Sequence, residues 1–249
     1  MPGGIVTIRG WIHPRNYAAL LLAVITLMMA VPFLHDTPAE RVVMTVLLTV
    51  ILLVSSLAMS PSRGLSLTAF ACACLAAILW ALFNLSGAAP FNTVLFKIAT
   101  YAAALAFFAT VVFIMLSDIL TGTVTGNRIC GAICVYLLMG VIFALLYLIA
   151  VSLNPQAFSL TDYSGRVLRN LSHYSFHDLF PVFLYYSFST LSTLGYGDII
   201  PLSRFAREVA ALEAISGQLY LTVLVARLVG LHIIVSHRSD AGSSSTPAS

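Results

Sequence analysis

A six-residue run beginning at Thr193 reads Thr-Leu-Gly-Tyr-Gly-Asp and has the residue types needed to surround a bare cation. Gly195 and Gly197 tolerate backbone angles that a Cβ would oppose, so successive carbonyls can be aimed at one axis. Carbonyl oxygens arranged in this way replace the water shell of a cation without adding fixed charge. Thr193 can add its hydroxyl as a ligand, whereas Leu194 and Tyr196 should point away from the axis and brace the strand.

Residues 193–198 resemble the selectivity filter of the tetrameric potassium channels, with Leu194 standing where those channels carry valine. The resemblance implies that the backbone of residues 193–197 coordinates permeant K⁺ and that no other cofactor is needed. It also implies a homotetramer, because one copy supplies only a quarter of the carbonyl ring. The alternative is an ordinary turn, since glycine and aspartate are common turn residues.

The composition is that of an integral membrane protein whose main partner is the lipid bilayer. The 249-residue chain is 60% hydrophobic and 8% charged, whereas soluble domains carry about 25% charged residues. A net charge of +3 is too small and too dispersed to indicate nucleic-acid binding. The four cysteines lie inside apolar runs, so neither a disulfide framework nor a metal site is indicated.

Six apolar runs are long enough to cross a membrane as helices. They cover residues 17–34, 42–59, 65–83, 98–117, 129–153 and 209–235. A further run at 179–194 is shorter and has Pro181 near its start, which predicts a re-entrant helix surrounded by protein or water. The expected fold class is therefore an all-α membrane protein with six transmembrane helices and a re-entrant pore helix.

These runs predict a division of the chain into a front domain and a pore domain. The expected parts are a cytoplasmic N-terminal segment at 1–16, a four-helix front domain at 17–118, a pore domain at 129–235 and a disordered cytoplasmic tail at 236–249. The pore domain has the order of the two-helix potassium channel pore, with a turret at 154–178. The resemblance implies a pore loop that enters from outside and cytoplasmic termini. The expected location is the inner membrane of a bacterial cell.

Several residues around the filter have expected supporting roles. Asp178 predicts the start of the pore helix, whose negative C-terminal end would favour a cation. Tyr185 and Tyr186 lie where similar channels carry an aromatic pair that packs around the filter, and the alternative is ordinary interfacial aromatics. Ser189 stands where some relatives place a carboxylate that pairs with the filter aspartate. Asp198 is therefore expected to lack that partner.

The last apolar run resembles the inner helix of bacterial potassium channels, with Gly217 at the hinge position. Glycine inside a helix is tolerated for a bend, and close packing is the alternative. If Gly217 faces the cavity, steps of four place Leu221, Val225 and Val229 on one apolar stripe that can close by dewetting. Glu213 lies one turn inside the outer end of this helix. An intramembrane acid needs a partner, and the expected partners are backbone amides behind the filter.

The front domain has the span number of a voltage sensor but not its charges. Its fourth span carries Lys97 as its single cation, whereas sensors carry arginines at every third position. Weak voltage dependence is therefore expected. His173, His177, His232 and His237 could sense pH, or they could be ordinary interfacial histidines.

Three other functions compete with a potassium channel. A weakly selective cation channel would share the pore. A potassium transporter subunit would carry four related filters in one chain, whereas this chain has one. A membrane enzyme would need an intramembrane acid–base or metal constellation, which the scattered acids do not supply.

Overall fold

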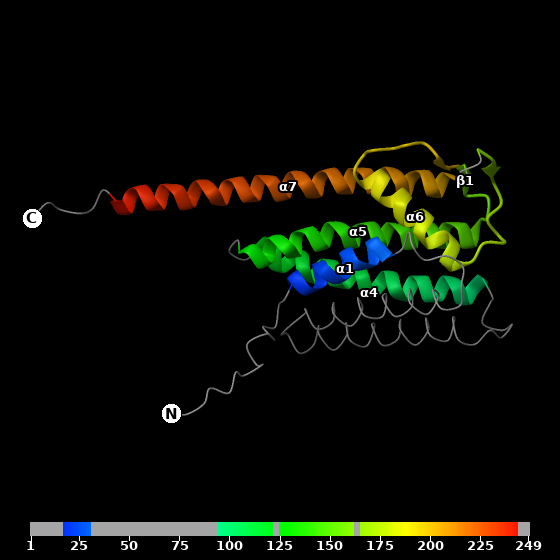
Figure 1. Cartoon of the computed structure of the whole chain (residues 1–249), viewed down its shortest axis with the longest axis horizontal. Helices are drawn as coiled ribbons and strands as arrows, with labels where there is room; N and C mark the ends of the chain where they lie inside the picture. The colour runs from blue at the N-terminus through cyan, green and yellow to red at the C-terminus, as the bar shows by residue number, and fades with distance from the viewer. Residues whose placement is uncertain (1–16, 31–93, 122–124, 162–164, 244–249) are drawn as a thin grey trace, which may run out of the picture.

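The computed structural model describes residues 17–30, 94–121, 125–161 and 165–243, with side chains through Arg227 in the last range. Helix α5 lies at the centre and packs against four other helices (Figure 1). The helices are α1 (Tyr17–Ala30), α4 (Val94–Thr121), α5 (Gly126–Leu153), α6 (Phe176–Leu191) and α7 (Arg204–Ser243), and the strands are β1 (Phe158–Thr161), β2 (Val167–Leu168) and β3 (Ile199–Pro201).

Within the described residues, three helices are long and apolar enough to cross a membrane: α4, α5 and the first part of α7. Their apolar length agrees with the spans predicted at 98–117, 129–153 and 209–235. The shorter apolar helix α1 falls in the first predicted span. The segment at 1–16 and the spans predicted at 42–59 and 65–83 lie outside the described residues, so the count of six stays a prediction.

Helix α7 differs from its prediction at both ends. It begins at Arg204 and continues to Ser243, and so enters the segment predicted to be disordered. The hydropathy pattern located only the apolar middle of the helix, because charged residues at its start and polar residues at its end have no apolar face to reveal a helix. Figure 1 shows α7 as one long helix that extends past α5 at the end opposite the sheet.

Helix α6, the predicted pore helix, begins earlier than expected. Its N-cap is Ser175, whose hydroxyl oxygen accepts from the Asp178 amide, while the Asp178 carboxylate accepts from the Ser175 amide at 2.7 Å. The pair forms a capping box, which satisfies two amides that the helix leaves unpaired. The expectation that Asp178 itself caps the helix is therefore wrong, because it occupies the third helical position. Pro181 lies inside the helix rather than in its first turn.

A small antiparallel sheet, which the sequence does not predict, joins the turret to the segment after residue 198. Its strand order is β2-β1-β3, and Leu160 of β1 pairs with Ile199 of β3. The amide of Thr161 also donates to the carbonyl of Asp198 at 2.9 Å. The described part of the chain thus fits the expected helical membrane protein, with this small sheet as an addition. These strands are two to four residues long, too short for an alternating pattern to be detected.

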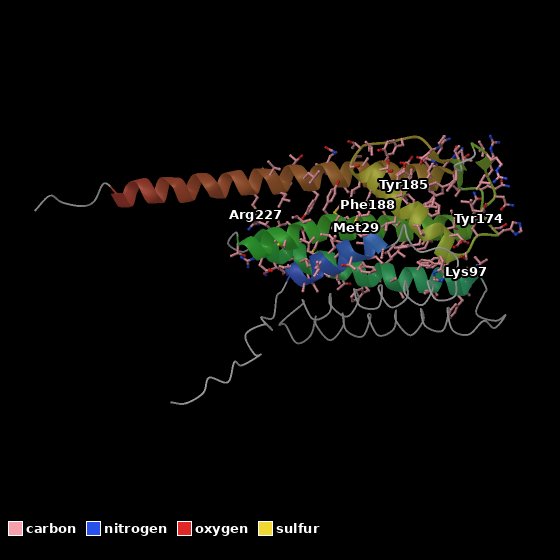
Figure 2. All side chains as sticks on the ribbon, viewed as in Figure 1. Met29, Lys97, Tyr174, Tyr185, Phe188 and Arg227 are labelled. Carbon is pink, nitrogen blue, oxygen red and sulfur yellow. The ribbon has the colours of Figure 1, made fainter. Side chains whose placement is uncertain are left out.

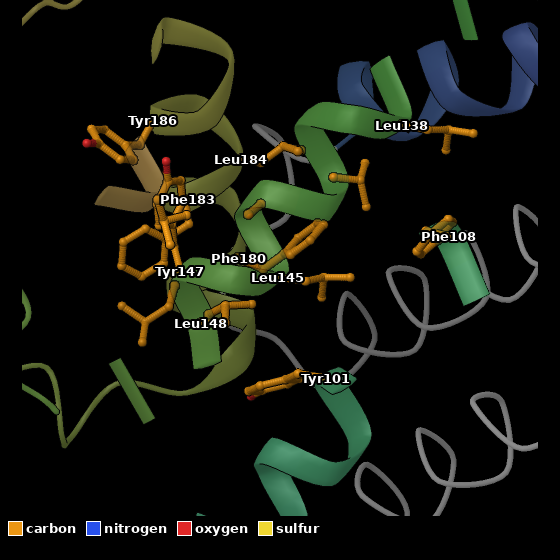
Figure 3. Close-up of a cluster of buried hydrophobic side chains, with 14 of the residues drawn as sticks. Tyr101, Phe108, Leu138, Leu145, Tyr147, Leu148, Phe180, Phe183, Leu184 and Tyr186 are labelled. Carbon is orange, nitrogen blue, oxygen red and sulfur yellow. The ribbon is translucent and has the colours of Figure 1, made fainter. Parts of the chain in front are cut away.

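An aromatic cluster holds α5, α6 and the sheet together. Tyr147 and Phe183 have no measurable exposure, and neither does Phe158 of β1. The Phe158 and Phe183 ring centroids lie 4.9 Å apart, edge to face. Those of Tyr147 and Tyr186 lie 5.0 Å apart, also edge to face, and Figure 3 shows these two tyrosines beside Phe183. Such pairs contribute roughly 0.5–1.5 kcal/mol each beyond their buried area. The cluster therefore anchors α6 against α5.

At the other end of α5, a polar cluster joins three helices. Arg128 of α5 forms an ion pair with Asp118 of α4 at 3.3 Å, and the Tyr17 hydroxyl of α1 donates to the same carboxylate at 2.9 Å. Both charged side chains are largely covered. The contact ties the described part of the predicted front domain to the first helix of the predicted pore domain.

Candidate functional site

The loop from Ser192 to Asp198, called the filter loop below, connects the C-terminus of α6 to β3. Thr193, Gly195 and Gly197 have positive φ angles of 58°, 58° and 79°. In this loop, Leu194 and Tyr196 do not have positive φ. A positive φ is a conformation that a Cβ disfavours, and glycine adopts it at little cost. The filter loop thus has positive φ at alternate residues, and at Gly195 and Gly197 these are the special backbone angles that the sequence predicts.

Thr193 was not expected to share the glycine conformation. Its φ of 58° is uncommon for a non-glycine residue and unusual for a β-branched one. Such strain costs of order 1–3 kcal/mol and persists where surrounding contacts impose it. Here the Thr193 amide donates to the Thr190 carbonyl at 2.9 Å, so the end of α6 holds the residue in place.

The end of α6 also anchors the next two residues. The amides of Leu194 and Gly195 both donate to the carbonyl of Ser189, at 2.8 and 3.2 Å. These bonds use amide protons of the filter loop and leave its carbonyls available for a ligand. The C-terminus of α6, where the helix dipole is negative, adjoins the loop, which favours a cation there.

The two tyrosines predicted to pack around the filter do so differently. Tyr185 is half-exposed, and its ring stacks on Tyr196 of the filter loop at a centroid distance of 6.1 Å and an interplanar angle of 10°. Tyr186 is buried in the aromatic cluster with Tyr147 and Phe158. Tyr185 therefore supports the loop directly, and Tyr186 supports the helix that carries it.

Two large side chains of the filter loop are uncovered. Leu194 is 56% exposed and Tyr196 is 66% exposed. A cavity of about 300 Å³ lies beside the loop. Its lining comes from α6, the loop, β3 and α7, through Tyr186, Ser189, Thr190, Thr193, Gly195, Tyr196, Gly197, Asp198, Ile199 and Ala214. Leu194 is thus not packed against other described residues as closely as its expected bracing role would require.

Asp198 is held by the three-stranded sheet of β2, β1 and β3, called the turret sheet below, rather than by α6. Its side-chain Oδ1 accepts from the Ile199 amide at 3.1 Å, and its carbonyl accepts from Thr161. Ser189 is buried, and its backbone carbonyl accepts the hydrogen bonds from the loop amides described above. Thr161 was missed by sequence reasoning, and no local signal marks it, because the pairing of β1 with β3 is non-local.

Glu213 is fully buried, and its partners are not the expected backbone amides. The Ser187 hydroxyl of α6 lies within hydrogen-bond distance of its Oε1, and the Tyr147 hydroxyl of α5 donates to its Oε2. The expectation is wrong because α7 turns Glu213 toward the middle of α6 rather than toward the filter loop. Sequence reasoning missed both hydroxyl residues, although a serine inside an apolar helix is a signal for a buried polar contact.

Gly217 is buried against the end of α6. A Cβ built at this position would overlap the Leu191 carbonyl oxygen and lie 3.0 Å from a Leu191 side-chain carbon. The residue therefore does not face an open cavity, as the stripe argument required, and close packing explains the glycine. Leu221 and Val225 are exposed on the single subunit, at 38% and 57%, and the side chain of Val229 lies outside the described residues. A hinge at Gly217 stays a prediction.

Comparison with known proteins assigns a class to this site. Residues 157–231, from the turret sheet through the filter loop and into α7, match the family model described as an ion channel. No curated protein and no solved structure matches the chain. With three apolar helices of spanning length, the match supports an integral membrane protein that conducts ions passively. The matched family is one of ion channels, not of enzymes.

Proposed function

We propose that this chain is the subunit of a potassium-selective channel in which four copies place their filter loops around one axis. The observation that carries the proposal is the alternation of positive φ at Thr193, Gly195 and Gly197. It occurs in the residues whose types resemble a potassium filter. Backbone carbonyls of residues 193–197 would replace the hydration shell of K⁺, with the Thr193 hydroxyl as an added ligand.

A fourfold assembly follows from the incompleteness of one subunit. A single loop supplies carbonyls on one side of the ion only, so a closed shell needs further copies. Leu194 and Tyr196 are exposed, and Tyr196 also lines the cavity. A neighbouring copy would cover this surface. The proposed ring supports K⁺ selectivity through backbone geometry. Weak selectivity among cations is the second candidate, because Leu194 lacks bracing within its own subunit.

The remaining parts of the pore are assigned by position. Leu221 and Val225 would line the inner cavity with Val229, because the first two are exposed and not because they share a stripe with Gly217. Gly217 packs against α6 and is the candidate hinge. Lys97 lies at the same end of the molecule as the turret sheet, and Arg227 lies toward the opposite end (Figure 2). With the turret outside, Lys97 sits at the outer surface. Cytoplasmic termini in a bacterial inner membrane complete the proposed topology.

Two glycine substitutions test this function. Gly195→Ala and Gly165→Ala place a Cβ at a positive φ of 58° and 77°, in each case with nothing within 4 Å of the new atom. Both therefore impose similar backbone strain, but Gly165 lies in the turret. In liposome flux assays, Gly195→Ala should abolish K⁺ flux or its selectivity, and Gly165→Ala should leave both intact. Normal selectivity in Gly195→Ala would rule out the filter assignment.

A further inference from the structure

A buried polar cluster lies where α5, α6 and α7 meet. Glu213 of α7 contacts the Tyr147 hydroxyl through Oε2 and the Ser187 hydroxyl through Oε1. The Ser187 hydroxyl also lies 2.8 Å from the carbonyl oxygen of Gly140 in α5. Three oxygen–oxygen contacts within hydrogen-bond distance therefore join three helices.

The number of protons available to these contacts determines the state of Glu213. Each hydroxyl carries one proton, whereas a backbone carbonyl or an ionised carboxylate has none to donate. Ser187 and Tyr147 supply two protons for three contacts, and the Gly140 carbonyl supplies none. All three contacts are hydrogen bonds only if the carboxyl group of Glu213 carries the third proton. Tyr147 then donates to Glu213, Glu213 donates to Ser187, and Ser187 donates to Gly140.

The surroundings of Glu213 agree with a neutral acid. No lysine, arginine or histidine forms an ion pair with Glu213 within the described part of the chain, where the neighbouring titratable groups are Tyr136 and Tyr147 of α5 and Tyr186 of α6. A tyrosine does not neutralise a carboxylate. An ionised carboxylate buried without a cation is so costly that such a group is expected to take up a proton instead.

We propose that Glu213 is a neutral positioning residue whose hydrogen-bond chain, Tyr147 to Glu213 to Ser187 to Gly140, fixes the depth and rotation of α6 between α5 and α7. Ser187 lies half a turn before Ser189, whose carbonyl holds the Leu194 and Gly195 amides. These hydrogen bonds thus set the position of the helix end from which the filter loop begins. The effect of these hydrogen bonds on selectivity rests on the proposed function, but the neutral state of Glu213 does not.

Infrared spectroscopy tests the protonation state independently of ion flow. The difference spectrum of wild type minus Glu213→Gln at neutral pH should contain the carbonyl band of a neutral carboxylic acid. The matched control is Glu208→Gln, because Glu208 lies exposed on the same helix, and its difference spectrum should contain carboxylate bands only. Carboxylate bands in the Glu213→Gln difference would overturn the proposal.

Permeability measurements test the positioning role. Glu213→Gln keeps the shape and offers one donor to Ser187 and one acceptor to Tyr147, so its preference for K⁺ over Na⁺ should equal that of wild type. Glu213→Ala removes two of the three hydrogen bonds and should lower that preference about tenfold, since the buried hydroxyl groups of Ser187 and Tyr147 lose their shared partner. Glu208→Ala should change nothing.

Two results would overturn the positioning role: a Glu213→Gln variant as impaired as Glu213→Ala, or a Glu213→Ala variant with wild-type selectivity. Should Glu213→Ala fail to assemble, the comparison of wild type with Glu213→Gln still decides, because only a neutral acid is reproduced by an amide. If wild type conducts no cation at all, the proposed function fails, and the infrared result still decides the state of Glu213.

Discussion

Gly217→Ala tests whether α7 is held against α6 as closely as the structure indicates. The new Cβ would overlap the Leu191 carbonyl oxygen, which is backbone and cannot rotate away. Relief requires α7 and the end of α6 to separate. Overpacking of this kind costs typically 1–3 kcal/mol, whereas replacing a helix-interior glycine by alanine contributes about 0.5–1 kcal/mol in favour of folding. The expected net effect is a loss of between about zero and 2.5 kcal/mol, and not a gain.

The sign of this effect separates close packing from a simple hinge. A glycine retained only for bending has no close neighbour, so alanine there would raise the free energy of unfolding by up to about 1 kcal/mol. Chemical unfolding in mixed micelles measures the difference. Gly126→Ala is the matched control, because nothing lies within 4 Å of its Cβ, and it should be neutral or slightly stabilising.

The same substitution should affect the filter loop. Leu191 is the last residue of α6, so a displaced helix end moves the carbonyls of Ser189 and Thr190, which hold the loop amides. Gly217→Ala should therefore reduce the preference for K⁺ over Na⁺ as well as stability. A Gly217→Ala protein that is more stable than wild type and equally selective would refute the packing argument.

Other predictions concern assembly, voltage and individual contacts. Native mass measurement in detergent should give four copies, and a functional monomer or dimer would exclude a ring. Open probability should vary shallowly between about −100 and +100 mV, since Lys97 crossing half the field in four subunits supplies only about 4 to 5 kcal/mol per 100 mV; a steep response flattened by Lys97→Gln would contradict this. Asp118→Asn should lower the free energy of unfolding by about 1 kcal/mol by weakening its largely covered ion pair, and an unchanged unfolding midpoint would contradict that estimate. Tyr185→Ala removes the ring that stacks on Tyr196 and should reduce K⁺ flux, whereas Tyr185→Phe should retain it.

The parts of the fold that could be predicted from the sequence depend on local patterns. Long apolar runs placed α4, α5 and the apolar part of α7, because membrane crossing requires about 20 consecutive apolar residues. Gly195 and Gly197 were predicted to take backbone angles that a Cβ would oppose, and both have positive φ. The capping box at Ser175 was also available from the sequence, since Ser-x-x-Asp is a recognisable helix start, but the nearby proline favoured a later boundary.

The parts that could not be predicted depend on contacts between distant segments. The turret sheet pairs strands of two to four residues across α6, and no periodicity marks strands so short. The position of Glu213 inside an apolar run predicted that its carboxyl group needs a partner. Which groups are that partner depends on the rotation of α5 and α6. Gly217 could pack closely or bend, and only the position of Leu191 distinguishes these roles. Thr193 takes its positive φ from anchoring by α6, which no propensity of threonine suggests.

The reversal potential of the purified wild-type protein in a planar bilayer tests the central claim most directly. With K⁺ in a tenfold gradient and Na⁺ as the balancing cation, a potassium filter built from residues 193–197 should give a reversal potential close to the K⁺ equilibrium value, about 59 mV for a tenfold ratio of a monovalent ion. A reversal potential near zero would show that the pore does not distinguish K⁺ from Na⁺, and would contradict the account.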